Sequence, residues 1–246
     1  EGALWAYELD TSSFDDGEVE VRIRVTDSAD KTAEKRVLVY IDNRSPVVLI
    51  KSPVAVDSQE FNDVVTIRGE ATDDSGIAQV TVSVFDDEDN EVNLLDEAGE
   101  PTGSNTAQAQ GTSSFSFAFR SRRYTAATES YRFLVHATDR AGTESDHFYY
   151  EDDVRAANSG EALSVEQLYT LEKPAQVEGL SITSATLESI RRDALGLTVN
   201  QNLDSPTFEF STPSEEGSVL GEGASAIGTV RDDDGVAVDT IEIRFD

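Results

Sequence analysis

The sequence contains no cysteine and no methionine, and only two of its 246 residues are histidine. Without cysteine the chain forms neither a disulfide framework nor a thiolate metal site. His136 and His147 have no partner at the spacing of a zinc site, and neither a nucleophile elbow nor a phosphate-binding glycine loop occurs. These absences predict that the chain is not an enzyme and has no catalytic residues.

Basic residues and long apolar runs are also scarce. Lysine and arginine total 19 against 49 acidic residues, which gives a formal net charge of −30. Nucleic acids and anionic membrane surfaces require clustered basic residues, so neither is expected as a partner. No stretch of 18 apolar residues is present, and we therefore expect no insertion into a bilayer.

The first residues, Glu1 to Trp5, lack the basic start and apolar centre of a signal peptide. Together with the absence of methionine, this favours an internal or processed piece of a longer protein. The acidity and the shortage of lysine suit either a high-salt environment or a GC-rich genome, and composition does not separate the two.

Apolar residues that are present recur with a period of two. Alternating runs occupy 19–25, 80–84, 115–119, 131–137 and 241–245, separated by clusters of Asp, Gly, Ser and Asn. Such alternation places one strand face in a core and the other in water, and the clusters supply turns. We therefore expect an all-β protein made of β-sandwiches.

Two half-motifs recur along the chain. Residues 43–53 return as 203–213, and 69–77 return as 228–236, a spacing of about 160 residues. Residues 5–9 match 115–119, and 21–29 match 133–141, a spacing of about 110 residues. One arrangement fits both spacings, and it predicts four parts: the C-terminal half of a domain (1–43), a complete domain (44–152), an insert or joint with short helices (153–203), and the N-terminal half of a third domain (204–246).

The insert has a different pattern. Val165, Leu168 and Leu171 share one helical face with Ser164 as N-cap, and 184–195 followed by Gly196 predicts a second short helix. Residues 86–113 are polar and predict an extended hairpin loop.

The stretches "SPVVLIKSP" with "TIRGEATDDSGIAQVTVSV", and "YRFLVHATDRAGT", resemble the opening and closing halves of bacterial immunoglobulin-like, cadherin-like tandem repeat domains. The resemblance covers 1–152 and 204–246, and it implies tandem immunoglobulin-like β-sandwiches of secreted or cell-surface proteins. We expect a structural and interaction segment: a stalk, adhesin, surface-layer or filament component whose partners are neighbouring repeats, copies of itself, glycans or surface proteins. The alternative is a carbohydrate-binding or spacer module of an exported hydrolase.

Acidic turns at repeated positions raise the possibility of bound Ca²⁺, which takes six to eight oxygen ligands. By resemblance to a cadherin-like joint, the ligands would be Asp27 and Asp30 of one turn, Asp42 and Asn43 of the linker, and Asp73 and Asp74 of the next turn. The other reading is that these residues only form turns and a solvated surface. Asp139 is expected to form a plain turn.

Overall fold

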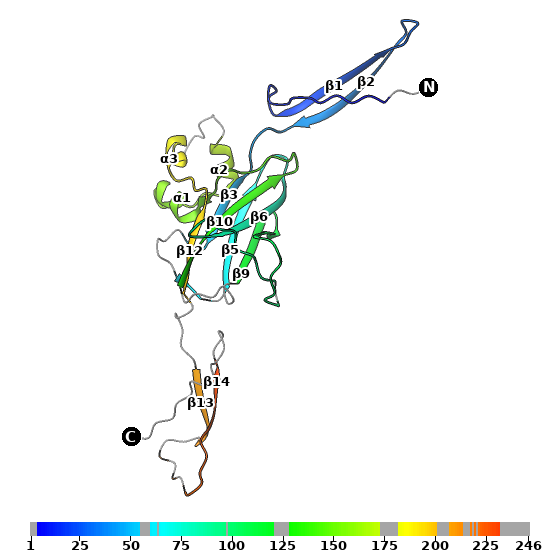
Figure 1. The fold of residues 1–246 in the computed structure, drawn as a ribbon. Coiled ribbons are helices and arrows are strands. Elements are labelled where there is room, and N and C mark those ends of the chain that lie inside the picture. Colours follow the sequence, from blue (N-terminus) through cyan, green and yellow to red (C-terminus); the bar gives the residue numbers. More distant parts are fainter. Residues whose placement is uncertain are drawn as a thin grey trace.

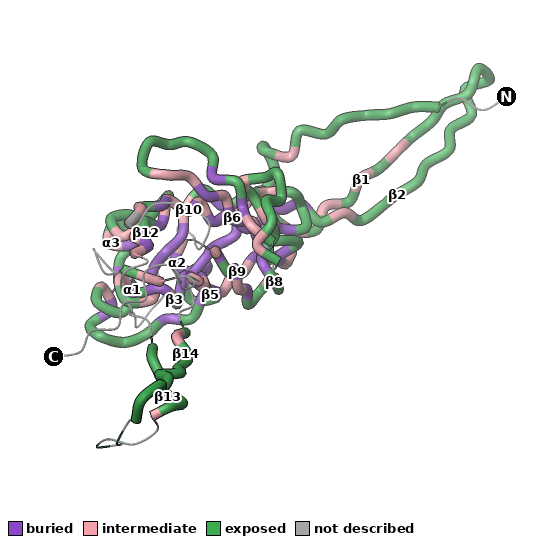
Figure 2. The backbone as a smooth tube through the Cα atoms, turned by 60° about the horizontal axis from the view of Figure 1, so that its bottom comes forward, coloured by how far each residue is buried: buried purple, intermediate pink, exposed green. Residues whose placement is uncertain are grey.

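The computed structural model describes residues 4–54, 60–62, 64–96, 98–120, 128–172, 182–200, 207–213, 217, 219 and 221–231. Figure 1 shows a hairpin, a central body and a second hairpin in a row. The first hairpin joins β1 (Gly17–Thr26) to β2 (Thr32–Ile41), and the second joins β13 (Thr207–Thr212) to β14 (Ile227–Arg231). Burial is concentrated in the central body (Figure 2). None of the described helices is long and apolar enough to cross a membrane.

Two five-stranded sheets form the central body. The first contains, in spatial order, β4 (Glu60–Phe61), β12 (Leu195–Asn200), β10 (Thr128–Asp139), β6 (Ile77–Asp86) and β7 (Thr106–Gln108). The second contains β11 (Tyr149–Tyr150), β3 (Val47–Ser52), β5 (Val64–Thr72), β9 (Ser114–Arg120) and β8 (Gln110–Gly111). The predominance of β-structure is confirmed. The described residues contain one complete two-sheet unit, and the tandem arrangement of sandwiches stays a prediction.

Alternating residues of both sheets meet in one core between them. Phe119 packs edge-to-face on Phe133 with ring centroids 5.1 Å apart. The remaining buried members include Val48, Ile50, Ile67, Val80, Val82, Val84, Phe115, Phe117, Val135, Leu195 and Val199. The period-two runs at 80–84, 115–119 and 131–137 therefore mark strands whose apolar face is buried, as predicted.

Strand β3 is buried on both faces, which explains its four consecutive apolar residues. Val48 and Ile50 belong to the core between the sheets, whereas Val47 and Leu49 pack in a second core beneath three helices. These helices are α1 (Glu151–Ala157), α2 (Val165–Leu171) and α3 (Ser184–Ser189). Ser164 caps α2 in a reciprocal capping box with Gln167, which confirms the predicted N-cap.

The described residues of the region expected as an insert, 153–172 and 182–200, pack on or pair with the sheets of the central body. Leu195–Asn200 forms β12, which pairs antiparallel with β10 in the same sheet. The second predicted helix ends at Ser189, six residues before the expected end, and Gly196 lies in β12 instead of terminating that helix. The reason is the alternation of Leu195, Leu197 and Val199, which buries one strand face in the core. The folded unit therefore extends beyond the expected boundary at 152, up to Asn200.

The repeats found in the sequence are also structural repeats. Phe210 pairs with Gly228 as Ile50 pairs with Gly69, and a register shift follows each pair. A Cβ on Gly228 would lie 2.7 Å from the Glu209 carbonyl oxygen, and one on Gly69 would lie 2.6 Å from that of Leu49. The hairpin β13–β14 thus repeats β3–β5.

The turn that follows β1 repeats the turn that follows β10. The Asp27 amide donates to the Lys31 carbonyl at 2.9 Å, and the Asp139 amide donates to the Thr143 carbonyl at 3.0 Å. In return, each aspartate Oδ1 accepts from the amide of the same partner. Residues 5–9, the counterpart of β9, form no strand, and the counterpart of β5 that would pair with them is not among the described residues. The predicted strand 241–245 also lies outside the described residues.

Candidate metal centre at the joint

The five residues between β2 and β3 form a short joint that is fixed on both sides. Towards the hairpin, the Asn43 amide donates to Asp16 Oδ1 at 2.8 Å, and Asn43 Nδ2 donates to the carbonyls of Thr11 and Phe14. The next residue, Arg44, turns towards the central body. Two adjacent residues of the joint therefore contact different parts of the chain, Asn43 the segment before β1 and Arg44 the central body.

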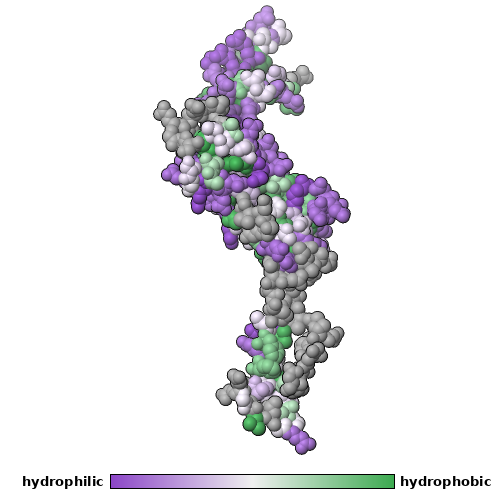
Figure 3. Space-filling view, turned by 90° about the vertical axis from the view of Figure 1, so that its left-hand side faces the viewer, coloured by the Kyte–Doolittle hydropathy of each residue, from purple (hydrophilic) through white to green (hydrophobic). Residues whose placement is uncertain are grey.

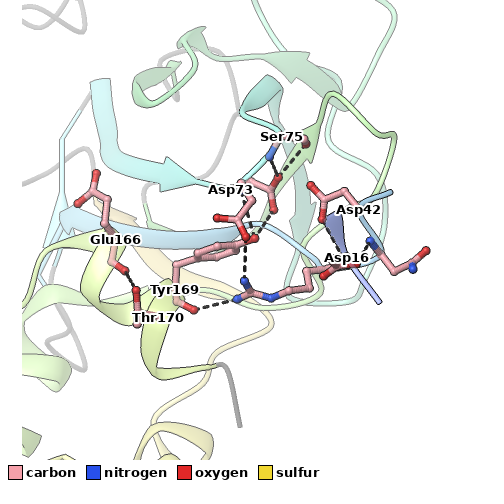
Figure 4. A network of polar contacts seen from close by, with 10 residues as sticks. Asp16, Asp42, Asp73, Ser75, Glu166, Tyr169 and Thr170 are labelled. Carbon is pink, nitrogen blue, oxygen red and sulfur yellow. Dashed lines mark hydrogen bonds and ion pairs between the residues drawn. The ribbon is translucent and has the colours of Figure 1, made fainter. Parts of the chain in front are cut away.

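Arg44 attaches the joint to α2 and to the turn after β5. Its Nη2 donates to the Tyr169 carbonyl at 2.9 Å, and its guanidinium lies 3.7 Å from the centroid of the Tyr169 ring. Its Nη1 contacts Asp74 Oδ2 at 3.4 Å. Figure 4 shows Tyr169 beside Asp73 and Ser75 of this acidic turn. Arg44 therefore contacts both α2 and the turn after β5.

Three aspartates from three different segments meet beside this joint. Asp42 follows β2, Asp73 follows β5, and Asp139 ends β10. Each offers one carboxylate oxygen to a group in which all the oxygens lie within 4.8 Å of one another. The pairing of β6 with β10 brings two of these turns together, because the Arg140 amide donates to the Gly76 carbonyl at 2.9 Å.

The three carboxylates are buried, and two of them have an oxygen without a hydrogen-bond partner among the described residues. Asp139 is 1% exposed, and Asp42 and Asp73 are each 9% exposed. Within the described residues, Oδ2 of Asp42 and Oδ2 of Asp139 are buried without a hydrogen-bond partner. Burial raises the pKa of Asp42, and the adjacent Asp73 raises it further. Grouped buried carboxylates with free oxygens are costly unless a proton or a cation neutralises them.

The donor set fits a hard cation. All three side chains supply oxygen, which Ca²⁺ prefers, and three carboxylates provide up to six oxygen ligands. The group contains no imidazole or thiolate, which are the typical ligands of zinc. Asp73 is already oriented, because its Oδ1 accepts from the amide and hydroxyl of Ser75 at 2.8 Å and its Oδ2 accepts from the Tyr169 hydroxyl at 3.1 Å (Figure 4).

The structure brings together two of the six residues expected as ligands, Asp42 and Asp73. Asn43 faces the hairpin, and Asp74 contacts Arg44. Asp27 and Asp30 occupy the turn at the far end of β1–β2. Ten register positions separate that turn from the joint, roughly 30 Å at 3.3 Å per residue. Those two residues therefore cannot share an ion with Asp42.

The residue that the sequence reasoning missed is Asp139, which was assigned to a plain turn. It does form a turn, but one of its carboxylate oxygens belongs to the acidic group, and its Oδ2 is buried without a hydrogen-bond partner among the described residues. Its repeat relationship to Asp27 was the signal that could have identified it. The hypothesis used the turn of the preceding hairpin, at Asp27, whereas the group beside Asp42 and Asp73 contains the corresponding turn of the central body, at Asp139.

A second polar cluster lies between the helices and β11. Glu172 accepts from His147 Nε2 at 2.8 Å and from the Tyr149 hydroxyl, and Arg191 Nε contacts that hydroxyl at 3.1 Å. Burial acts to raise the pKa of Glu172, but the hydrogen bonds from His147 and Tyr149 outweigh it and lower that pKa. The carboxylate is thus already paired with cationic and neutral donors, and the cluster attaches the helices to the sheet.

Comparisons with known proteins give only a distant likeness. No known protein family matches the chain, and no curated protein matches it in sequence. Among solved structures, the chain is similar to the fibronectin(III)-like modules of Clostridium thermocellum CbhA. That match has 12% identity and a TM-score of 0.34, and it covers 77% of this chain and 66% of the other. A likeness this distant identifies neither a family nor an activity.

Proposed function

We propose that this chain is a structural and interaction segment of a large exported repeat protein, in which sandwich units are joined end to end as a stalk, adhesin, surface layer or filament. The observation that carries the proposal is the joint between β2 and β3, residues 42–46. It connects the hairpin β1–β2 to the central body with five residues, and the adjacent residues Asn43 and Arg44 attach it to each. Short anchored joints of this kind restrict the angle between neighbouring units and so favour stiff arrays.

We further propose that Ca²⁺ occupies the group formed by Asp42, Asp73 and Asp139. Supporting this are three buried carboxylates within 4.8 Å and two buried oxygens that have no protein partner in the described chain. A cation would remove the repulsion within the group and would link the end of β2 to two turns of the central body. Binding would therefore stabilise the orientation of the hairpin relative to that body.

Calorimetric titration with Ca²⁺, together with thermal unfolding in Ca²⁺, Mg²⁺, EDTA and molar KCl, tests this proposal. A ligand present at 100 times its dissociation constant stabilises the folded state by about 2.7 kcal/mol. The variant Asp139→Asn keeps the turn but loses a charge at the group, and we expect it to weaken binding at least tenfold. Asp27→Asn is the matched control, since Asp27 makes the same turn far from the joint. Equal stabilisation by KCl and Ca²⁺ would contradict a specific site.

Small-angle scattering tests the structural role separately. We expect the molecule to have the same extended shape at low and at high protein concentration. The distribution of molecular lengths should be narrower in Ca²⁺ than in EDTA. A collapsed or highly variable shape in both conditions would contradict a stiff segment, whatever the titration shows.

The alternative of a carbohydrate-binding module receives no support from the exposed aromatic residues. Trp5 and Tyr7 are 60% and 80% exposed, yet they are the sequence counterparts of Phe115 and Phe117 in the core. They belong to a half unit whose other sheet is not among the described residues. Their exposure is therefore explained by incomplete packing, without a glycan.

A further inference from the structure

The chain enters and leaves the central body at opposite ends. Val47 begins β3 and pairs with Thr72 beside the joint. Asn200 ends β12 and pairs with Thr128, the first residue of β10. From there β10 runs to Asp139, which lies in the carboxylate group at the joint. Figures 1 and 3 accordingly show β1–β2 and β13–β14 beyond opposite ends of the central body.

Tension along the chain would therefore pull β3 and β12 lengthwise, in opposite directions. In an antiparallel pair the hydrogen bonds are perpendicular to the strands, so a lengthwise pull acts on all of them together and not on one after another. β3 has β5 as its antiparallel partner, and β12 has β10. Each also has a short parallel partner on its other edge, β11 for β3 and β4 for β12. Both of the pulled strands are thus paired along two edges.

β3 is in addition held on both faces. Val48 and Ile50 lie in the core between the sheets, whereas Val47 and Leu49 lie in the core beneath the helices, and all four are at most 1% exposed. Sliding β3 out of the body would expose these side chains to water together. In a sandwich of two sheets alone, the outer face of such a strand would be open to water. The helices supply the second core on the strand that follows the joint.

We propose that the central body carries tension along the chain, and that the helical layer formed by α1, α2 and α3 anchors β3 against it. The inference rests on the proposed function, because the chain is pulled from both ends only as a segment of a longer array. It gives the helical layer a role that a two-sheet sandwich does not require. The cation group is not needed for it, so the experiments use EDTA.

Force ramps in optical tweezers test the direction of pulling. Handles at the two termini apply tension from β3 to β12. Because the chain has no cysteine, Glu144→Cys gives a single alternative point of attachment. Glu144 lies in the turn after β10, at the joint end, so a handle there and one at the N-terminus pull across the strands. We expect the body to unfold at a lower force in this second geometry, and equal forces in the two geometries would overturn the proposal.

A matched pair of substitutions tests the helical layer. Val47→Ala and Val82→Ala remove the same two methyl groups from residues that are 1% and 0% exposed. Val47 lies on β3 beneath the helices, whereas Val82 lies on β6, which is not connected to either pulled end. A contact that breaks on the way to the unfolding transition state affects the unfolding rate in full, so Val47→Ala should unfold about tenfold faster at a given tension.

Val82→Ala should leave that rate almost unchanged, although denaturant unfolding should show that both variants fold and are less stable than the parent chain. Equal acceleration by the two substitutions would overturn the anchoring role of the helical layer. Small-angle scattering separates this inference from the proposed function. An extended chain whose body unfolds at the same force in both geometries would overturn only the inference, and a collapsed chain whose body resists end-to-end tension would overturn only the proposed function.

Discussion

The hydroxyl of Tyr169 in α2 donates to Oδ2 of Asp73 at 3.1 Å, and it accepts from the Asp74 amide at the same distance. One phenol thus connects the helices to the acidic turn that contributes to the candidate metal centre. Burial raises the pKa of this hydroxyl, so it remains protonated and able to donate throughout the physiological range.

Replacement of Tyr169 by Phe should weaken this connection. The ring and its contact with Arg44 would remain, but Asp73 would lose a donor and the Asp74 amide an acceptor. A hydrogen bond contributes about 0.5–1.5 kcal/mol, so the melting temperature should fall by roughly 2–6 °C. Differential scanning calorimetry measures the change, with Tyr40→Phe as control because Tyr40 is 57% exposed on β2. Equal effects of the two variants would contradict a specific role for the Tyr169 hydroxyl.

Asp42→Asn should have opposite effects in the absence and presence of Ca²⁺. The pKa of Asp42 is raised by burial and by Asp73, so the ionised form is disfavoured in the folded state at neutral pH. Removing the charge should therefore increase the melting temperature in EDTA by about 2–4 °C for each kcal/mol recovered. In Ca²⁺ the same variant should lose most of the stabilisation that the parent chain gains. A variant that is less stable in both conditions would contradict this account of the site.

The strands of the central body were predictable because each buries one face, and burial of one face requires alternation. The exception is instructive. β12 is short and pairs with β10 across more than fifty residues of sequence, and no local signal specifies that partner. The alternation of Leu195, Leu197 and Val199 was visible in the sequence. The stretch before it is compatible with a helix, however, and the predicted helix was extended to 195, although α3 ends at Ser189.

The candidate site was predictable only in part for a similar reason. The repeat showed which turns contain aspartate, but it did not show which turns share one end of a sheet. That depends on β5, β6 and β10 lying in two facing sheets, and hence on tertiary structure. Asp73 was identified because it lies in the repeated motif 69–77, and Asp42 because it resembles the linker of a cadherin-like joint. Asp139 was missed because its sequence context specifies a turn equally well with or without a cation.

The pair formed by His147 and Glu172 should make stability depend on pH. Burial acts to lower the pKa of His147, but its hydrogen bonds to Glu172 and Asp146 outweigh burial and raise that pKa. Because the folded pKa exceeds the ordinary 6.5, this stabilisation is complete below pH 6.5 and is lost as the pH rises through the raised value. For Glu172, whose pKa is lowered, the stabilisation is present above 4.5 and is lost as the pH falls through the lowered value.

The contribution of this pair should therefore be greatest between about pH 4.5 and pH 6.5. His147→Gln removes the titrating group, and we expect it to lower the melting temperature most within that window and least at pH 8.5. Thermal unfolding across this range measures the difference between variant and parent. His136→Gln is the control, since His136 contacts the Ser145 carbonyl and not Glu172. A difference that does not vary with pH would contradict the role of the charged pair.

Gly69→Ala should destabilise the central body by about 1–3 kcal/mol, the usual cost of overpacking. An added Cβ would lie 2.6 Å from both the Leu49 carbonyl oxygen and the ring of Phe115, so β3 or β9 would have to move. Gly196→Ala in β12 is the matched control, because its Cβ would meet nothing within 4 Å. Alanine there should be neutral or slightly stabilising, since glycine inside a strand loses more conformational entropy on folding. Denaturant unfolding at equilibrium measures the change in the free energy of unfolding for each variant. If Gly196→Ala destabilised the protein as much as Gly69→Ala, close packing against β3 and β9 would not be the reason for glycine at position 69.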